Sequence, residues 1–199
     1  MSELLFLHTP NCVEAGCDEA GRGCLAGPVV AAAVILRNPI LGLNDSKKLT
    51  KKNRDKLRLI IQKNALAYSV AIVSPQRIDV INILNASIEA MKLALDGLNV
   101  IPEHIIVDGN AFSAYMGINY NTIIKGDTKF QSIAAASILA KTYRDDLMET
   151  LHIENTNYNW RKNKGYPTKE HRERIQLHGV SPQHRITFRL LPKKAVKTK

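Results

Sequence analysis

Two apolar segments near the start of the chain lie only eight residues apart, and this spacing limits the folds that the chain can adopt. Residues 12–19 and 28–36 both have the composition of buried strands, and a glycine-arginine-glycine element lies between them. Parallel neighbouring strands need a connection of about a dozen residues or more. We therefore expect these two strands to be joined by a turn, in a sheet that cannot be wholly parallel.

The rest of the chain alternates between strand and helix patterns. Short apolar runs that stop at Pro, Asp-Gly or Gly-Asp predict strands, and apolar positions that recur at threes and fours predict helices. The predicted strands are 65–75, 104–110 and 121–127; the predicted helices lie within 44–64, 76–98 and 130–151, with a short one between Thr168 and Gly179. This order predicts an α/β fold, with a mixed sheet covered by helices.

Positive charge is concentrated in the last quarter of the chain. The formal net charge is +10, and residues 151–199 hold 12 basic and only 3 acidic side chains. Such a segment attracts polyanions, of which nucleic acid is the commonest, although a merely solubilising face is the alternative. We expect a catalytic domain over 1–155, a basic helical substrate-binding segment over 156–191 and a disordered basic tail over 192–199.

The sequence also bears on the compartment in which the protein works. No run of about 18 apolar residues predicts a transmembrane helix, and the first residues do not have the pattern of a signal peptide. Cys12, Cys17 and Cys24 match no zinc-binding spacing, so we expect them to be small buried side chains in a reducing compartment. These features favour a cytoplasmic protein that makes no contact with a membrane.

Acidic residues follow three of the predicted strands. Asp18 and Glu19 end the first, Asp108 ends the strand at 104–110, and Asp127 ends the strand at 121–127. Each taken alone is an ordinary turn or surface residue. If the strand ends converge, the four carboxylates cannot all stay ionised without cations, and two Mg²⁺ or Mn²⁺ ions match their oxygen ligands. Two such ions, with the basic segment, indicate a metal-dependent nuclease.

An ordered series of motifs resembles the bacterial ribonuclease HII family, the type 2 ribonucleases H. The motifs are "DEAGRG" at 18–23, "GPVVAAAVIL" at 27–36, "DSKKL" at 45–49, "VDGN" at 107–110, "KGD" at 125–127, "SIAAASILAKTYRD" at 132–145 and "KGYPTKEH" at 164–171. Type 3 enzymes typically read "DESGKG" at the first motif, so the type 2 family is favoured. A type 3 enzyme is the runner-up, and a non-catalytic nucleic-acid-binding module is a distant third.

The resemblance implies an RNase H-like fold with a central mixed five-stranded sheet, flanking helices and a C-terminal helical segment. It implies hydrolysis of the RNA strand of RNA–DNA hybrids and cleavage 5′ to single ribonucleotides in duplex DNA, leaving 3′-hydroxyl and 5′-phosphate ends. It places the metal-binding catalytic carboxylates on Asp18, Glu19, Asp108 and Asp127. A DNA sliding clamp is a candidate partner that no residue here identifies, and nothing in the sequence requires more than a monomer.

Substrate contacts are expected from a second group of residues. The resemblance places junction recognition on Tyr166 and on the loop Gly21, Arg22 and Gly23, whose glycines let the backbone approach a 2′-hydroxyl. Phosphate contacts are expected from the clustered Lys47 and Lys48, with a solvated helix start as the alternative, and Ser132 and Lys141 are candidates for the same role near Asp127.

Several other polar and aromatic side chains are expected to have structural roles. Asp145 and Asp146 lie on a predicted helix beside Arg144, where surface ion pairing is the simpler interpretation than metal contact. The spacing of the C-terminal histidines does not support a general acid, so we expect backbone contacts or plain surface positions for His171, His178 and His184. Trp160 and Tyr158 are expected to pack rather than to stack on bases.

Overall fold

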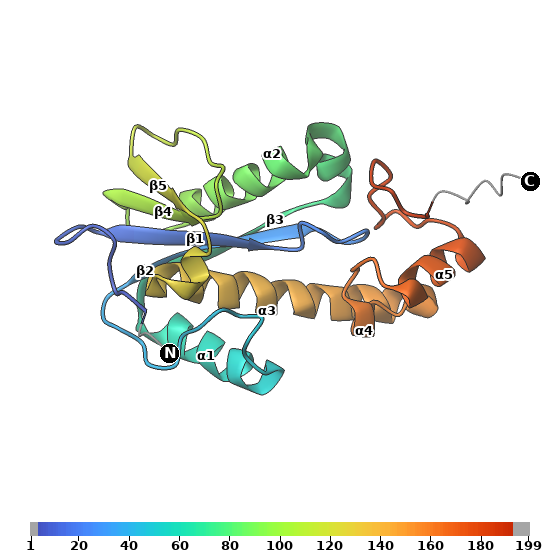
Figure 1. The fold of residues 1–199 in the computed structure, drawn as a ribbon, viewed down its shortest axis with the longest axis horizontal. Helices are drawn as coiled ribbons and strands as arrows, with labels where there is room; N and C mark the ends of the chain where they lie inside the picture. Colours follow the sequence, from blue (N-terminus) through green and yellow to red (C-terminus); the bar gives the residue numbers. More distant parts are fainter. Residues whose placement is uncertain (1–3, 193–199) are drawn as a thin grey trace, which may run out of the picture.

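A single sheet of five strands organises the computed structural model, which describes residues 4–192 (Figure 1). The strands are β1 (Glu14–Ala20), β2 (Val29–Leu36), β3 (Ala65–Val73), β4 (His104–Asp108) and β5 (Asn119–Ile123). Their order across the sheet is β3-β2-β1-β4-β5, so β1 is central. Of the tail expected over 192–199, residues 193–199 lie outside the described residues.

The sheet is mixed, as predicted from the short connection near the start of the chain. β1 runs antiparallel to β2, and β2 runs antiparallel to β3. β1 runs parallel to β4, and β4 runs parallel to β5. The carboxyl-terminal ends of β1, β4 and β5 therefore lie at one edge of the sheet, where the sequence places its acidic residues.

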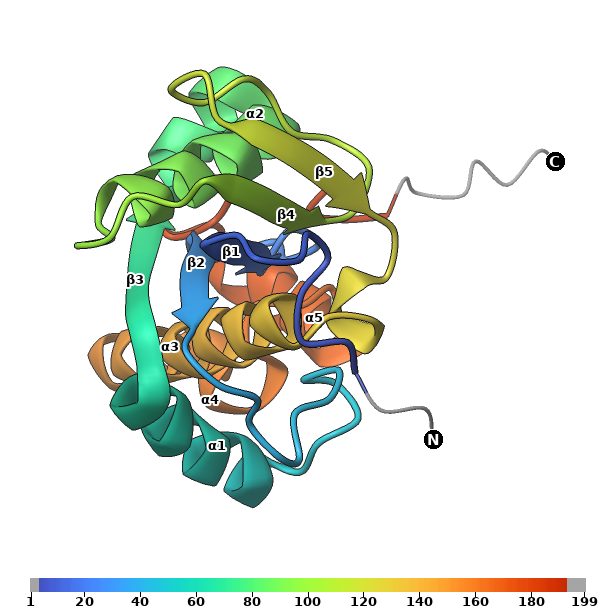
Figure 2. The same ribbon diagram turned by 90° about the vertical axis from the view of Figure 1, so that its left-hand side faces the viewer.

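Helices cover both faces of the sheet. α2 (Pro75–Asp96) packs on one face, and α1 (Lys51–Asn64) and α3 (Gln131–Glu154) pack on the other (Figure 2). Side-chain caps fix where two of these helices begin: the Thr50 hydroxyl accepts from the Asn53 amide, and the Ser74 hydroxyl accepts from the Arg77 amide. Each layer buries its own apolar cluster, and β2 is buried on both faces because it lies between them.

α3 lies unusually close to β1 because both elements present small residues. A Cβ placed on Gly16 would come 2.3 Å from the backbone of Ser132, so only glycine fits at this crossing. Ala134, Ala135 and Ala136 are completely buried along the same helix. These alanines let the helix approach the sheet, and Gly16 supplies the matching surface on the strand.

α2 is kinked near its start, which the apolar periodicity does not reveal. Asn82 has a backbone φ of 65°, and its Oδ1 accepts a hydrogen bond of 3.1 Å from the Asn85 amide. Asparagine is among the non-glycine residues that adopt positive φ most readily. The kink leaves the helix as two segments that together match the predicted range of 76–98.

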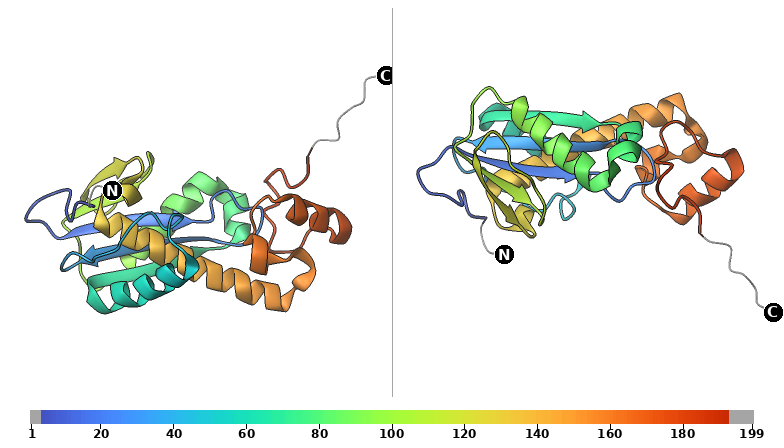
Figure 3. Two further views of the ribbon diagram at one scale, coloured as in Figure 1. Left: turned by 60° about the horizontal axis from the view of Figure 1, so that its bottom comes forward. Right: turned by 90° about the horizontal axis from the view of Figure 1, so that it is seen from above.

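The C-terminal part of the described chain forms a small helical unit at one end of the sheet (Figure 3). It contains the 3-10 turn η2 (Thr156–Tyr158), α4 (Trp160–Asn163) and α5 (Lys169–His178). Thr168 caps α5 and Gly179 follows its last residue, as predicted. Its apolar cluster joins Tyr158, Trp160 and Ile175 to Leu25, Ala26 and Met148. No helix within residues 4–192 is long and apolar enough to cross a membrane.

Candidate active site

A cavity of about 270 Å³ opens where β1 and β4 end. It unites acidic residues, the loop after β1 and side chains from distant parts of the chain. Its lining consists of Asp18, Glu19, Ala20, Gly21, Arg22, Gly23, Ser46, Lys47, Asp108, Ser137, Lys141 and Tyr166. Most of the site residues predicted from the sequence therefore meet in one place.

The parallel pairing of β1 and β4 places two of the carboxylates side by side. The last paired residues of these strands are Cys17 and Val107, and Asp18 and Asp108 come next. Asp18 Oδ1 accepts a 2.7 Å hydrogen bond from the Glu19 amide, which holds its carboxylate at the strand end. The convergence expected from the sequence is thus a direct result of strand register.

Asp127 reaches the site from a turn rather than from the end of a strand. β5 ends at Ile123, earlier than predicted, because Lys125 adopts a left-handed conformation with φ 57° and turns the chain into η1 (Gly126–Thr128). The Gly126 amide then donates a 2.7 Å hydrogen bond to Asp108 Oδ1. Asp127 is 5% exposed and does not line the cavity itself, but this bond ties its turn to the end of β4.

The acidic residues interact strongly enough to change their protonation. Burial, with added repulsion from Glu19 and Asp108, raises the pKa of Asp18 well above its ordinary value, although a hydrogen bond from Ser137 opposes the shift. Burial also raises the pKa of Glu19, and the Arg22 guanidinium 3.2 Å away opposes that rise. Burial and the charge of Asp108 raise the pKa of Asp127. Burial and mutual repulsion therefore both disfavour the charged forms of these carboxyl groups.

The carboxylates nevertheless do not form one tight ligand cluster. Within the described part of the chain, the group of three potential ligands whose atoms all lie within 4.8 Å is His8, Glu14 and His104, at the other end of β1. A pair of ions about 3.5–4 Å apart needs ligands spread over a wider area than one ion does.

Two lysines border the acidic residues. Burial lowers the pKa of Lys47, but the surrounding carboxylates, chiefly Asp127 and Asp18, outweigh burial and raise it overall. Lys141 Nζ lies 2.6 Å from Asp145 Oδ1 and 5.9 Å from the centre of the Tyr166 ring. Both ammonium groups line the cavity, where they can meet an anionic substrate.

Two predicted substrate contacts are not brought to this cavity. Lys48 is exposed and lines a neighbouring hollow with Leu49 and Thr128. Ser132 is 2% exposed, lies against Gly16 beneath β1, and has no hydrogen-bond partner for its hydroxyl among the described residues. Burial at the α3–β1 crossing separates Ser132 from any molecule in the cavity.

Asp145 and Asp146 form ion pairs, as expected, but not with Arg144. Asp145 pairs with Lys141 one helical turn earlier, and Asp146 Oδ2 lies 2.5 Å from Arg58 on α1. Neither aspartate lines the cavity. Arg144 is 1% exposed and points instead into the interior, where it donates hydrogen bonds to backbone carbonyl oxygens.

Two buried arginines hold the loop that follows β1. Arg144 donates to the carbonyl oxygens of Pro28, Lys164 and Ala26 at 2.8–3.1 Å. Arg185 is completely buried and donates to the Gly27 carbonyl oxygen at 3.0 and 2.8 Å and to that of Arg22 at 2.9 Å. Helix α3 and the C-terminal segment thereby position the same loop.

The two glycines of this loop differ in what they permit. Gly21 has φ +100°, and a Cβ there would come 2.1 Å from Arg144 Nε, so the buried guanidinium requires glycine. Gly23 has nothing within 4 Å of a would-be Cβ. Its backbone therefore faces open space in the cavity, as expected for a peptide group that meets a ligand.

Tyr166 also lines the cavity, with its ring centre 6.0 Å from the guanidinium of Arg144. Its side chain is 39% exposed, and its carbonyl oxygen accepts a 2.9 Å hydrogen bond from His171 Nδ1. His171 and His184 are buried, so the expected backbone contact of His171 is confirmed and a surface position for either is wrong. Trp160 donates to His171 and stacks on Tyr158 at 5.0 Å, which confirms that these aromatic residues pack.

Sequence reasoning missed several residues that shape the site. Asp45 interacts with Asp127, and its Oδ1 accepts a 2.9 Å hydrogen bond from the Lys47 amide. Ser46 and Ser137 line the cavity with their hydroxyl oxygens 2.9 Å apart. Asp45 and Ser46 belong to the "DSKKL" motif, in which only the lysines were considered as substrate contacts. Nothing local in the sequence marks Arg144 or Arg185 as loop supports.

Comparisons of sequence agree on one family. The family model described as Ribonuclease HII matches residues 15–191. Ribonuclease HII of Bacteroides thetaiotaomicron is 61% identical over 190 residues, which cover 94% of this chain and 95% of the relative. Ribonuclease HII of Parabacteroides distasonis is 59% identical over 182 residues, covering 90% and 92%.

Comparisons of structure agree with those of sequence. The ribonuclease H2 from Pyrococcus horikoshii matches with a TM-score of 0.76 at 27% identity, covering 89% of this chain and 94% of that one. A PCNA:RNase HII complex from Archaeoglobus fulgidus also matches with a TM-score of 0.76, at 28% identity, covering 92% and 98%. The arrangement of strands and helices is therefore shared with solved ribonucleases of this type.

Proposed function

The chain belongs to the ribonuclease HII family of metal-dependent endoribonucleases that act on RNA–DNA hybrids, and we propose that it also cuts 5′ to single ribonucleotides embedded in duplex DNA. The products carry 3′-hydroxyl and 5′-phosphate ends. The observation that carries the proposal is the single cavity that joins Asp18 and Asp108 to Tyr166 and the 21–23 loop. The carboxylates proposed for hydrolysis and the residues proposed for substrate recognition thus line the same cavity.

Asp18, Glu19, Asp108 and Asp127 are the proposed ligands of two divalent ions, Mg²⁺ or Mn²⁺. They fit hard cations because they offer only oxygen donors, and because burial, with repulsion from Asp108, raises the pKa values of Asp18, Glu19 and Asp127, a cost to their charged forms that a bound cation would offset. When bound, such ions activate a water molecule and stabilise the leaving oxygen of a phosphodiester. The hydrogen bond from the Gly126 amide to Asp108 holds Asp127, the next residue, near Asp108.

The loop Gly21–Gly23 is the proposed sensor of the ribose 2′-hydroxyl. Arg185 donates a hydrogen bond to the Arg22 carbonyl oxygen and Arg144 packs against Gly21, and the open space beside Gly23 lets a nucleic-acid strand approach its peptide groups. Tyr166, which is partly exposed in the same cavity, is the proposed stacking surface for the sugar of the following deoxynucleotide. Because these contacts read the sugar rather than the base, cleavage is expected to depend little on base sequence.

The basic segment 156–191 is the proposed grip on the duplex. It packs beside the loop through hydrogen bonds such as that of 2.8 Å from the Leu25 amide to the Gly165 carbonyl oxygen. Its lysines and arginines can neutralise phosphates on both sides of the cut, which fixes position without reading sequence. Lys47 and Lys141 extend this positive surface into the cavity, whereas Lys48 faces the adjacent hollow.

Cleavage of a labelled DNA duplex that holds one ribonucleotide, with Mg²⁺, Mn²⁺ or EDTA, tests the proposal. We expect a single metal-dependent cut just 5′ to the ribonucleotide. A duplex that stays intact while a long RNA–DNA hybrid is cut indicates type 3 specificity. If neither substrate is cut with either metal, the proposal is wrong and nucleic-acid binding without hydrolysis becomes the leading alternative.

A DNA sliding clamp is a proposed partner. The support is the Archaeoglobus fulgidus relative, whose solved structure is a complex with PCNA. Size-exclusion chromatography of the protein with and without a bacterial clamp tests this: co-elution supports the partnership, and separate elution of both proteins contradicts it. The same run without the clamp checks the prediction of a monomer. A cytoplasmic location stays a prediction.

A further inference from the structure

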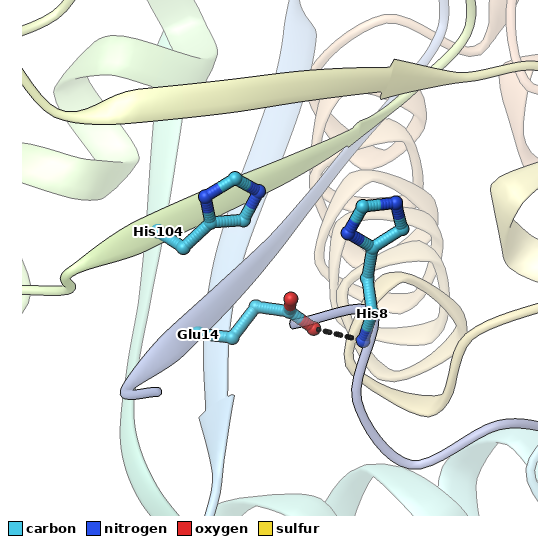
Figure 4. Close-up of side chains that lie close together, drawn as sticks. All are labelled: His8, Glu14 and His104. Carbon is cyan, nitrogen blue, oxygen red and sulfur yellow. Dashed lines mark hydrogen bonds between the residues drawn. The ribbon is translucent and has the colours of Figure 1, made fainter. Parts of the chain in front are cut away.

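A second group of metal-ligating side chains lies at the other end of the β1–β4 pair. Glu14 begins β1 and His104 begins β4, and these two residues are direct partners in the parallel register. His8 approaches them from the segment before β1 (Figure 4). Four residues of strand, about 13 Å at the usual rise, separate Glu14 from Asp18. This group is therefore distinct from the carboxylates of the active site.

The three side chains are near enough to bind one ion. One ring nitrogen of each histidine and one carboxylate oxygen of Glu14 lie within 4.8 Å of one another. Zinc-to-ligand distances are about 2.0–2.2 Å, so ligands of one ion lie roughly 3–3.6 Å apart. Because His8 is exposed, its side chain has room to rotate toward the other two ligands.

Glu14 is a buried carboxylate that forms no ion pair with any described residue. It is 2% exposed, and its two oxygens accept hydrogen bonds of 3.0 and 2.9 Å from the backbone amides of His8 and Thr9. Each oxygen retains a second lone pair. A buried anion gains much from a cationic partner, and both imidazoles stand beside this one.

Both histidines already have one ring nitrogen engaged by a neutral group. His104 Nε2 lies 2.9 Å from Asn121 Oδ1, and His8 Nδ1 lies 3.2 Å from Thr9 Oγ1. The two rings are parallel, with an interplanar angle of 2° and centroids 5.8 Å apart. Outer hydrogen bonds of this kind orient the imidazoles of metal-binding histidines.

We propose that His8, Glu14 and His104 bind one divalent transition-metal ion of the zinc class. Two imidazoles and one carboxylate favour Zn²⁺, Co²⁺ or Ni²⁺ over Mg²⁺, and leave a fourth position for water. The ion ties the segment before β1 to two strands of the sheet. Because the Leu5 amide donates to Lys129 and the Gln131 amide donates to Leu5, it also braces the chain that follows Asp127.

Zinc titration of the intact protein by calorimetry tests this site. Excess Mg²⁺ is present throughout, so that the active-site carboxylates are already occupied. We expect one zinc ion to bind, with affinity reduced at least tenfold in His8→Ala and in His104→Ala. His178→Ala, at an exposed histidine that ends α5, is the matched control and should bind zinc as the parent does. Zinc should also raise the melting temperature of the parent and not that of His8→Ala.

His8→Ala keeps the test decisive, because this side chain is exposed and its loss does not empty the core. Cobalt absorption in the visible range gives a second readout, and its nitrogen-dependent bands should disappear in His104→Ala. The proposal is overturned if no zinc binds, or if both histidine variants bind it as the parent does while Asp18→Asn does not. Mg²⁺-dependent cleavage by His8→Ala should be unchanged, so failure here leaves the proposed function untouched.

Discussion

Asp18 and Asp108 occupy matching positions on two parallel strands, each one residue beyond the last paired residues. Parallel strands end at the same edge of a sheet, so the two carboxylates meet without any intervening turn. Their proximity is thus built into the backbone and does not depend on a mobile loop. An amide can replace either carboxylate with little change of shape, which makes the role of charge testable.

Asp18→Asn should abolish cleavage while the protein stays folded. We expect the rate to fall by at least about 10²–10³-fold, the range for loss of one electrostatic contact at a reacting centre. Single-turnover cleavage of the one-ribonucleotide duplex measures this, with far-UV circular dichroism as the check on folding. Asp146→Asn is the control because it removes a surface ion pair with Arg58, and it should keep full activity. Full activity in Asp18→Asn contradicts the assignment.

The metal-free protein should be destabilised by its own active site as pH rises. The pKa of Asp18 is raised in the folded state, so its contribution to stability is fully present below the unfolded value of about 3.9 and is lost as pH rises through the folded value. In EDTA, Asp18→Asn should therefore melt higher than the parent at pH 7.5 and show no advantage at pH 4. Thermal melts across this range measure the difference.

The contribution of His184 to stability changes with pH in the opposite direction and must be separated from that of Asp18. Burial lowers its pKa to about 4, so its contribution is present above about 6.5 and is lost as pH falls toward 4. The shift is the same in the parent and in Asp18→Asn, and it cancels when the two curves are subtracted. The interpretation of Asp18 is contradicted if the difference in melting temperature between Asp18→Asn and the parent shrinks as pH rises. It is also contradicted if Mg²⁺ does not reduce that difference.

Tyr166→Ala should impair cleavage at a single ribonucleotide more than it impairs stability. The ring is partly exposed on the cavity wall, so its removal empties little of the core but takes away the stacking surface. Tyr166→Phe keeps the ring and separates stacking from the hydroxyl. Rates on the one-ribonucleotide duplex and on a long hybrid are compared for each variant. Equal losses on both substrates would refute a role at the junction.

Arg185→Lys should loosen the sensing loop even though the charge is kept. A lysine cannot reproduce the hydrogen bonds that Arg185 donates to Gly27 and Arg22, and we expect a loss of about 1.5–3 kcal/mol in the free energy of unfolding. Urea denaturation measures this. Arg189→Lys, at an exposed arginine nearby, should change stability by less than about 0.5 kcal/mol. Equal stability of the two variants contradicts the role of Arg185.

The sequence was most informative where local pattern decides the structure. Strand and helix periodicity predicted the order of elements, and the position of Asp18 and Asp108 at strand ends predicted their convergence. Thr168 and Gly179 marked the ends of α5 because capping is a local interaction. The type 2 family was identified from the ordered motifs, and the family comparison confirms it.

Prediction failed where a residue's role depends on a distant partner. Ser132 has a favourable position in a motif, but the close approach of Gly16 buries it. Arg144 directly precedes Asp145 and Asp146, yet it contacts backbone carbonyls of segments far away in the sequence. Asp127 was assigned to the end of a strand because the left-handed turn at Lys125 has no clear sequence signal.

The hydrogen bond from Arg185 to Arg22 also has a consequence for the order of folding. It spans 163 positions, so the proposed sensing loop cannot be fixed by this bond until most of the chain has been synthesised. β1 and β4, which carry Asp18 and Asp108, need far less of the chain to pair. Pulse-labelled hydrogen exchange should show their amides protected before that of Leu25. A nascent chain therefore acquires its acidic centre before it acquires the means to choose a substrate.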